Sequence, residues 1–145
     1  MKSKTEVLDN REFIKWFIEA VRTKLGCADV DIRIALILGA SLVTTILAPL
    51  DLQPGDIVIT FVCNNKLYIA KLRAEFSLYY RRSDGSVGKN TVNLMNPHVE
   101  AALIYDRKLG FFNNALIRID DGTSIEIYEL NPIPTTPVNP GLTSG

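Results

Sequence analysis

A group of aromatic and basic residues carries the clearest potential chemistry in this chain. Tyrosine rings stack on unpaired bases and basic side chains bind phosphates, so the combination indicates a nucleic-acid-binding strand face. Sixteen basic and sixteen acidic residues cancel, however, so no overall charge attracts a polyanion. A solvated strand with ordinary strand tyrosines is the simpler interpretation. The candidate residues are Lys71, Arg73, Tyr79, Tyr80, Arg81 and Arg82.

Residues for catalysis or metal binding are few. His98 is the only histidine, which rules out a histidine cluster within one subunit. Asp120 and Asp121 are typical of a turn and lack the calcium-loop pattern. Cys27 and Cys63 lack zinc-site spacing, and two buried reduced thiols are favoured, although spacing leaves a disulfide open. The sequence therefore predicts no catalytic residue, metal ligand, cofactor or small-molecule ligand, and a protein that is not an enzyme.

The run from residue 34 to 50 contains no charged residue. As a helix it would extend about 25 Å, against roughly 30 Å of bilayer hydrocarbon. We interpret it as a second helix on which small residues recur every four positions at Ala40, Thr44 and Ala48. Such a strip allows another backbone to approach closely, either in a bilayer or between subunits.

A first helix is predicted after Asp9 or Asn10, which can cap it, and before Gly26, which can end it. Trp16 and Phe17 lie on its apolar face, for which packing in the core is the ordinary interpretation. Together with Ala40, Thr44 and Ala48, these two aromatic residues form the predicted self-association interface.

From residue 56 onward, alternating apolar residues predict strands, including a hairpin of 57–63 and 67–73 around Asn64 and Asn65. Further strands are expected at 75–82 and 91–94, a helix at 97–108 after Asn96, and a final hairpin of 111–119 and 124–130. We therefore expect an α+β fold. It has two N-terminal helices, then a mainly antiparallel β-sheet or small barrel of about five to six strands with one inserted helix, and an extended Pro-rich C-terminal tail.

The expected organisation is a flexible N-terminus at 1–9, a single α+β domain at 10–130 and an extended or disordered tail at 131–145. Within the domain, 10–50 is expected to be helical and 56–130 β-rich. No secretory signal opens the chain, so a cytoplasmic location is expected, with peripheral or integral membrane attachment left open.

The leading functional hypothesis is a non-catalytic structural protein that self-associates through its hydrophobic N-terminal helices. The homo-oligomer could be part of a larger assembly such as a virion-type particle. Two alternatives stay open. One is a nucleic-acid-binding module that uses the aromatic and basic face, and the other is a membrane-attached protein anchored by residues 34–50.

Overall fold

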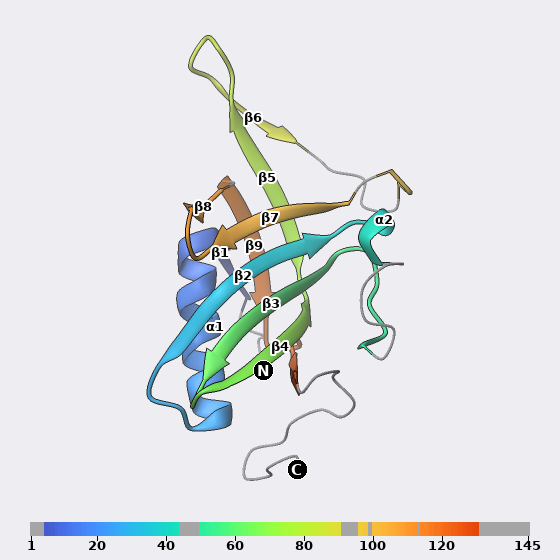
Figure 1. Ribbon diagram of the computed structural model, residues 1–145. Coiled ribbons are helices and arrows are strands. Elements are labelled where there is room, and N and C mark those ends of the chain that lie inside the picture. Colours follow the sequence, from blue (N-terminus) through green and yellow to red (C-terminus); the bar gives the residue numbers. More distant parts are fainter. Residues whose placement is uncertain (1–4, 44–49, 91–95, 99, 113, 131–145) are drawn as a thin grey trace.

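The computed structural model describes residues 5–43, 50–90, 96–98, 100–112 and 114–130, apart from the side chains of residues 42, 43, 80, 81 and 90. The described part is mostly β-structure (Figure 1). Its elements are β1 Thr5–Asp9, α1 Asn10–Leu25, β2 Val30–Leu38, α2 Ala40–Val43, β3 Asp56–Cys63, β4 Lys66–Arg73, β5 Glu75–Arg81, β6 Val87–Asn90, β7 Ala101–Asp106, β8 Gly110–Phe111, β9 Asn114–Asp120 and β10 Ile125–Glu129.

All strand pairings are antiparallel, and they form two sheets. The larger sheet has six strands in the order β10-β4-β3-β2-β7-β8, and the smaller has four in the order β1-β9-β5-β6. The chain passes from the larger sheet to the smaller through Ala74, the single residue between β4 and β5. In Figure 1 the six-stranded sheet lies in front of α1 and β9, while β5 and β6 extend beyond the rest of the protein.

The helix α1 forms where its local signals predict it. Asp9 is the N-cap, and its carboxylate accepts a hydrogen bond from the Glu12 backbone N–H. The Glu12 carboxylate in turn accepts one from the Asp9 backbone N–H, which completes a capping box. Gly26 ends the helix with a φ of 68°, in the left-handed region that glycine tolerates best. The predictions of this helix and of both its ends are therefore confirmed.

One apolar core is enclosed by α1 and the inner faces of both sheets. Phe13, Phe17 and Val21 of α1 are fully buried in it, and the ring of Phe17 contacts that of Phe61 edge-on, with centroids 5.6 Å apart. A disulfide joins Cys27, just after α1, to Cys63 at the end of β3, with Cα atoms 5.9 Å apart. The favoured expectation of two reduced thiols therefore does not hold.

The prediction of a second N-terminal helix over residues 34–50 is wrong. Its first part is the end of β2, the only helix after α1 among the described residues is the four-residue α2, and residues 44–49 lie outside the described part. The strand β2 lies between β3 and β7 and carries apolar side chains on both faces, including the β-branched Ile32, Ile34 and Ile37. A strand buried on both faces is a continuous apolar run without helical periodicity.

The predictions of an inserted helix at 97–108 and of a single small sheet or barrel are also wrong. Residues 101–106 form β7, whose pairing with β2 overrides the helix-start signal of Asn96 and the proline after it. The predicted last hairpin does not form, because β9 pairs with β1 and β5 while β10 pairs with β4 in the other sheet. The hairpin of β3 and β4 is confirmed, and its turn residues Asn64 and Asn65 have φ values of 52° and 63°.

Among the described residues, no helix has the length and apolar character needed to cross a membrane.

Candidate interaction face

The six-stranded sheet has a second apolar face, directed away from α1, which we term the outer face. Side chains alternate across a strand, and Ile57, Ile59 and Phe61 of β3 belong to the main core. Val58, Thr60 and Val62 therefore lie on the outer face. The same alternation and the strand register place further apolar residues there, namely Ile34, Leu36 and Leu38 of β2, Leu67 and Ile69 of β4, Leu103 of β7 and Tyr128 of β10.

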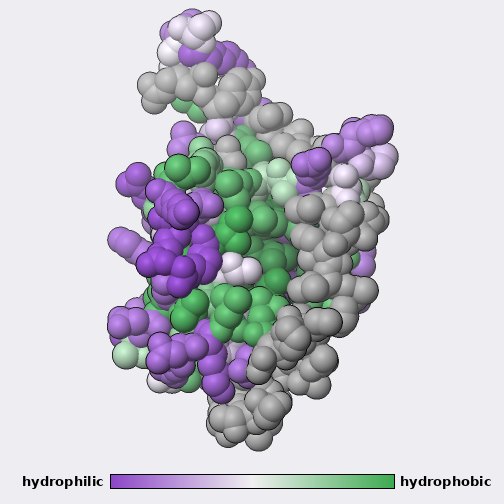
Figure 2. Space-filling view, in the orientation of Figure 1, coloured by the Kyte–Doolittle hydropathy of each residue, from purple (hydrophilic) through white to green (hydrophobic). Residues whose placement is uncertain are grey.

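Part of the outer face is covered by the chain itself. Leu50 and Leu52 pack over Leu38, Val58 and Ile69 and form a second, smaller apolar cluster. The remaining outer-face residues are only half-buried, and Leu67 is 42% exposed. Figure 2 views the protein from this side and shows hydrophobic residues across the centre of the face, bordered on the left by hydrophilic ones. A contiguous exposed apolar area of this kind is typical of an interaction surface.

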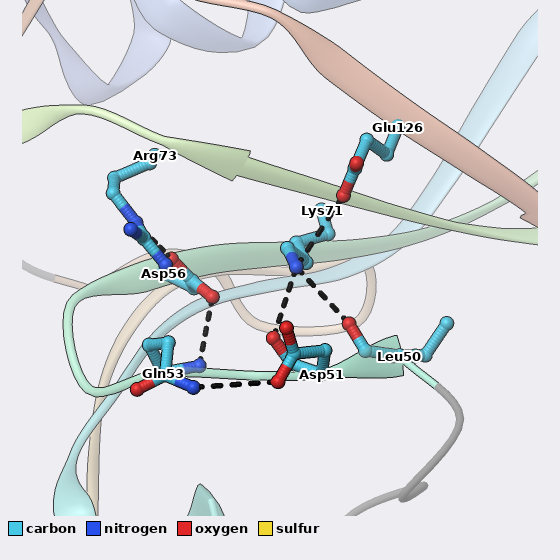
Figure 3. Close-up of polar contacts among 7 residues, drawn as sticks. All are labelled: Leu50, Asp51, Gln53, Asp56, Lys71, Arg73 and Glu126. Carbon is cyan, nitrogen blue, oxygen red and sulfur yellow. Dashed lines mark hydrogen bonds and ion pairs between the residues drawn. The ribbon is translucent and has the colours of Figure 1, made fainter.

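A polar network holds residues 50–56 against one end of the outer face (Figure 3). Asp56 is fully buried, and one of its oxygens accepts a hydrogen bond from Arg73 Nε at 2.8 Å. The other carboxylate oxygen accepts one from the Gln53 backbone N–H, also at 2.8 Å. The hydrogen bond to Asp56 and its negative charge raise the pKa of Arg73 above its usual value. The carboxylate thus ties the segment to the first residue of β3.

Lys71 extends this network along β4. Its ammonium group donates to the backbone carbonyls of Leu50 and Asp51, both at 3.0 Å, and forms an ion pair with Glu126 of β10 at 3.3 Å. Only 14% of the Lys71 side chain is exposed. The network therefore fixes Leu50 over the sheet, and the residues that the structure describes leave the strip between β2, β3 and the far end of β4 uncovered.

Ion pairs border the uncovered strip at the start of β2. Asp31 of β2 pairs with Arg33 at 3.2 Å and with Arg107 at 3.3 Å. An apolar centre with a polar, charged rim is the usual anatomy of a protein–protein interface.

Both edges of the six-stranded sheet discourage pairing with another strand. One edge, β8, has only two residues. The other, β10, carries Glu126 and Glu129, which are held in place by Lys71 and Lys66 of β4. Short edge strands and charged edge residues hinder edge-to-edge association. The outer face is therefore a more accessible contact surface than the edges.

The residues predicted for self-association from sequence are scattered. Phe17 is fully buried in the main core, and Trp16 is half-buried and stacks on Phe13 with ring centroids 5.6 Å apart. Ala40 is half-buried in α2, whereas Thr44 and Ala48 lie outside the described residues. The structure does not place Trp16 or Phe17 on the outer face.

The residues predicted for nucleic-acid binding are divided between the two sheets. Lys71 and Arg73 lie in β4 and are engaged by Glu126 and Asp56 as described above. Tyr79, Tyr80 and Arg81 lie in β5 of the four-stranded sheet, and Arg82 follows, its backbone N–H bonded to the Ser86 carbonyl at 2.8 Å. No single face collects all six residues.

Sequence reasoning assigned the outer-face residues of β3, β4 and β10 to strands and those of β2 and β7 to helices, and it did not identify their face as exposed. The alternation in 57–63 and 67–73 was visible, and both sides of each strand are largely apolar. That pattern fits a strand buried on both faces, so it gives no signal that one face lacks a cover. The exposure of this face follows from the packing of α1 on only one side of the six-stranded sheet.

In the described part of the chain, no three potential metal ligands from His, Cys, Asp and Glu lie close enough together to hold a metal ion.

Comparisons with protein-family models, with curated proteins and with solved structures give no match. The function is therefore inferred from geometry.

Proposed function

We propose that the chain is a non-catalytic interaction protein that self-associates through the outer face of the six-stranded sheet. A second copy packs its own outer face on the first, in the manner of two sheets of a β-sandwich. The hydrophobic helices expected from sequence have no part in this contact. The observation that carries the proposal is the partly exposed apolar strip formed by the 42% exposed Leu67 and the half-buried Ile34, Leu36, Val62 and Leu103.

A second copy is the favoured occupant for reasons of charge and shape. The formal net charge of the chain is zero, so two copies do not repel each other at long range. Asp31 at the rim pairs with Arg33 and Arg107 of the same subunit, so these charges are already compensated when the faces meet. An apolar face is also complementary to itself, as a two-fold symmetric contact requires.

The contact is expected to be reversible. The uncovered residues are already half-buried in the isolated chain, so each gains less than the ~1.5–3 kcal/mol of a fully transferred side chain. Association also costs roughly 4–15 kcal/mol of translational and rotational freedom. We therefore expect a dimer that dissociates on dilution rather than a permanent one.

The test is light scattering coupled to size exclusion over a range of loading concentrations. Leu67→Lys adds a charge to the strip at an exposed position and should shift the protein to monomer. The matched control is Leu109→Lys, which changes a 74% exposed leucine between β7 and β8 in the same way. A protein that is monomeric at every concentration would refute the proposal, as would a dimer that Leu67→Lys leaves intact.

A further inference from the structure

A pocket of about 510 Å³ lies on the four-stranded sheet, away from the outer face discussed above. Its lining residues come from four strands and from the start of α1, and they are Asp9, Asn10, Arg11, Tyr79, Val87, Asn114, Ala115 and Leu116. The volume is within the range of roughly 300–1,000 Å³ that is usual for small-ligand sites. The pocket therefore has room for a compact organic ligand.

The strand register explains why these residues meet. Tyr79 of β5 lies opposite Asn114 of β9, and Leu116 of β9 lies opposite Asp9 of β1. Because side chains two residues apart share a face, these four residues lie on one side of the sheet. This side faces away from the main core, which takes Ile117 and Ile119 from the other side of β9. Four neighbouring strand positions thus form one continuous floor.

The floor combines an aromatic ring with aliphatic and hydrogen-bonding groups. Tyr79 is half-buried, and Leu116 and the 59% exposed Val87 add aliphatic surface. The amide of Asn114 offers both a donor and an acceptor. A flat ring that stacks on Tyr79 and also presents hydrogen-bonding edges would use all of these groups.

The charged groups narrow the choice of ligand further. Asp9 and Arg11 line the same end of the pocket and cancel in charge, so neither a simple anion nor a simple cation is favoured there. The Arg11 guanidinium carbon lies 5.4 Å from the centre of the Phe111 ring, close enough for a cation–π contact. On the other side, Lys89 of β6 is the register partner of Tyr79. The centre is neutral, and a cationic group lies on either side of it.

We propose that this pocket binds a single unstacked nucleobase, carried either by a free nucleotide or by a single-stranded nucleic acid. The base stacks on Tyr79 and forms hydrogen bonds with Asn114, and the attached phosphate lies near Lys89. The site uses Tyr79 from the residues predicted for nucleic-acid binding and does not need Lys71 or Arg73. It is independent of self-association, since it lies on the other sheet.

The test measures binding of adenosine and uridine monophosphates and of fluorescently labelled single-stranded RNA of about eight nucleotides, at low salt. Base stacking on an aromatic side chain contributes about 1–3 kcal/mol, so Tyr79→Leu should weaken binding by about 5- to 150-fold while Tyr79→Phe preserves it. Tyr128→Leu is the matched control, because Tyr128 is a half-buried tyrosine on the other sheet. Asn114→Ala should weaken binding as well.

Binding of the monophosphates and the RNA with similar affinity would support the proposal with a free nucleotide as the ligand. Binding of the RNA alone, lost in Tyr79→Leu, would support it with a strand as the source of the base. If neither probe binds, the proposal fails. It also fails if Tyr79→Leu and Tyr128→Leu have equal effects on binding in proteins that melt at the same temperature.

Discussion

Asp56 is fully buried, yet the arginine that neutralises it, Arg73, is 67% exposed, with 2.8 Å between Asp56 Oδ1 and Arg73 Nε. A buried carboxylate is costly unless it is paired and hydrogen-bonded, and here it has both a cationic partner and a backbone N–H donor. The pair holds the segment before β3 on the sheet. In doing so it sets the boundary between the covered and uncovered parts of the outer face.

Replacing Arg73 with methionine should therefore destabilise the protein, because the buried Asp56 carboxylate loses its cationic partner. We expect a loss of about 2–3 kcal/mol in the free energy of unfolding, below the 3–5 kcal/mol typical of fully buried pairs, because water reaches the guanidinium side. Urea unfolding measures this loss in the free energy of unfolding. Lys66→Met is the control, since it removes a partly exposed pair and should cost less than about 1 kcal/mol. Equal losses in the two variants would contradict a special role for Asp56.

Removing the disulfide should lower stability through the unfolded state. Cys27 and Cys63 are separated by 36 positions, and closing a loop of that size is worth up to about 4 kcal/mol in the chain-entropy account. Urea unfolding of Cys27→Ser combined with Cys63→Ser should therefore show a loss of about 2–4 kcal/mol. Reductant should lower the stability of the unmodified protein and leave the serine variant unchanged. Two free thiols in mass spectrometry of the non-reduced protein would contradict the bond.

The same bond bears on location. Disulfides persist in oxidising compartments and are rare in a reducing cytosol. The expectation of a cytoplasmic protein rested on the polar N-terminal residues alone and took no account of this bond. The cytoplasmic location stays a prediction, and the disulfide argues against it.

Tyr68 should make stability decrease at alkaline pH. Burial first, and the negative charge of Glu129 second, raise its pKa above the ordinary value of 10.0. The folded protein thus retains the phenolic proton at pH values at which the unfolded chain has lost it. The resulting stabilisation is complete below the unfolded pKa and is lost as the pH rises toward the folded pKa. Unfolding curves at pH 8 to about 11 should show a smaller decrease for Tyr68→Phe than for the unmodified protein, and parallel decreases would contradict this.

The turn between β3 and β4 offers a test of backbone conformation. Asn64 and Asn65 both have positive φ, which suits the tight hairpin turns that match strand twist. Asn65→Ala should lower the free energy of unfolding by about 1 kcal/mol, because alanine lacks the short polar side chain whose local hydrogen bonds allow asparagine to adopt this region. Asn65→Gly should be neutral or slightly stabilising. Thermal melts distinguish the two, and an alanine variant as stable as the glycine variant would contradict the assigned turn.

Local signals in the sequence were enough for α1 and for the hairpin of β3 and β4. The capping box of Asp9 and Glu12, the stop at Gly26 and the Asn64–Asn65 turn each act within a few residues. Tertiary context matters little there, so the sequence reading and the structure agree.

The errors occur where pairing between distant segments decides the structure. Apolar residues on both faces made β2 look like a helix, and only its position between β3 and β7 shows why it is a strand. Asn96 accepts a hydrogen bond from the His98 backbone N–H, as at a helix start, but residues 101–106 then pair with β2. The turn after β9 suggested a hairpin, whereas β9 pairs with β1, more than a hundred residues earlier.

The candidate sites show the same contrast between local signals and pairing of distant segments. The sequence marked Tyr79 as a possible binding residue, but Asn114 and Asp9 join it only through the register of β5, β9 and β1. Leu67 and Val62 were placed in strands correctly, and they are neighbours in the register of β3 and β4. That their face is left partly uncovered depends on where α1 packs and where residues 50–56 end, which no local pattern encodes.

The most direct test of the central claim is a distance measurement between nitroxide labels on different copies of the chain. One sample carries the label at Leu67→Cys on the outer face, and the other at the exposed control position Leu109→Cys. Two packed sheets lie about 10 Å apart, so we predict strong dipolar coupling between copies from Leu67→Cys and weaker coupling from Leu109→Cys. Dilution with unlabelled protein should remove the dipolar coupling in both samples. Absence of coupling from Leu67→Cys, or stronger coupling from Leu109→Cys, would contradict self-association through the outer face.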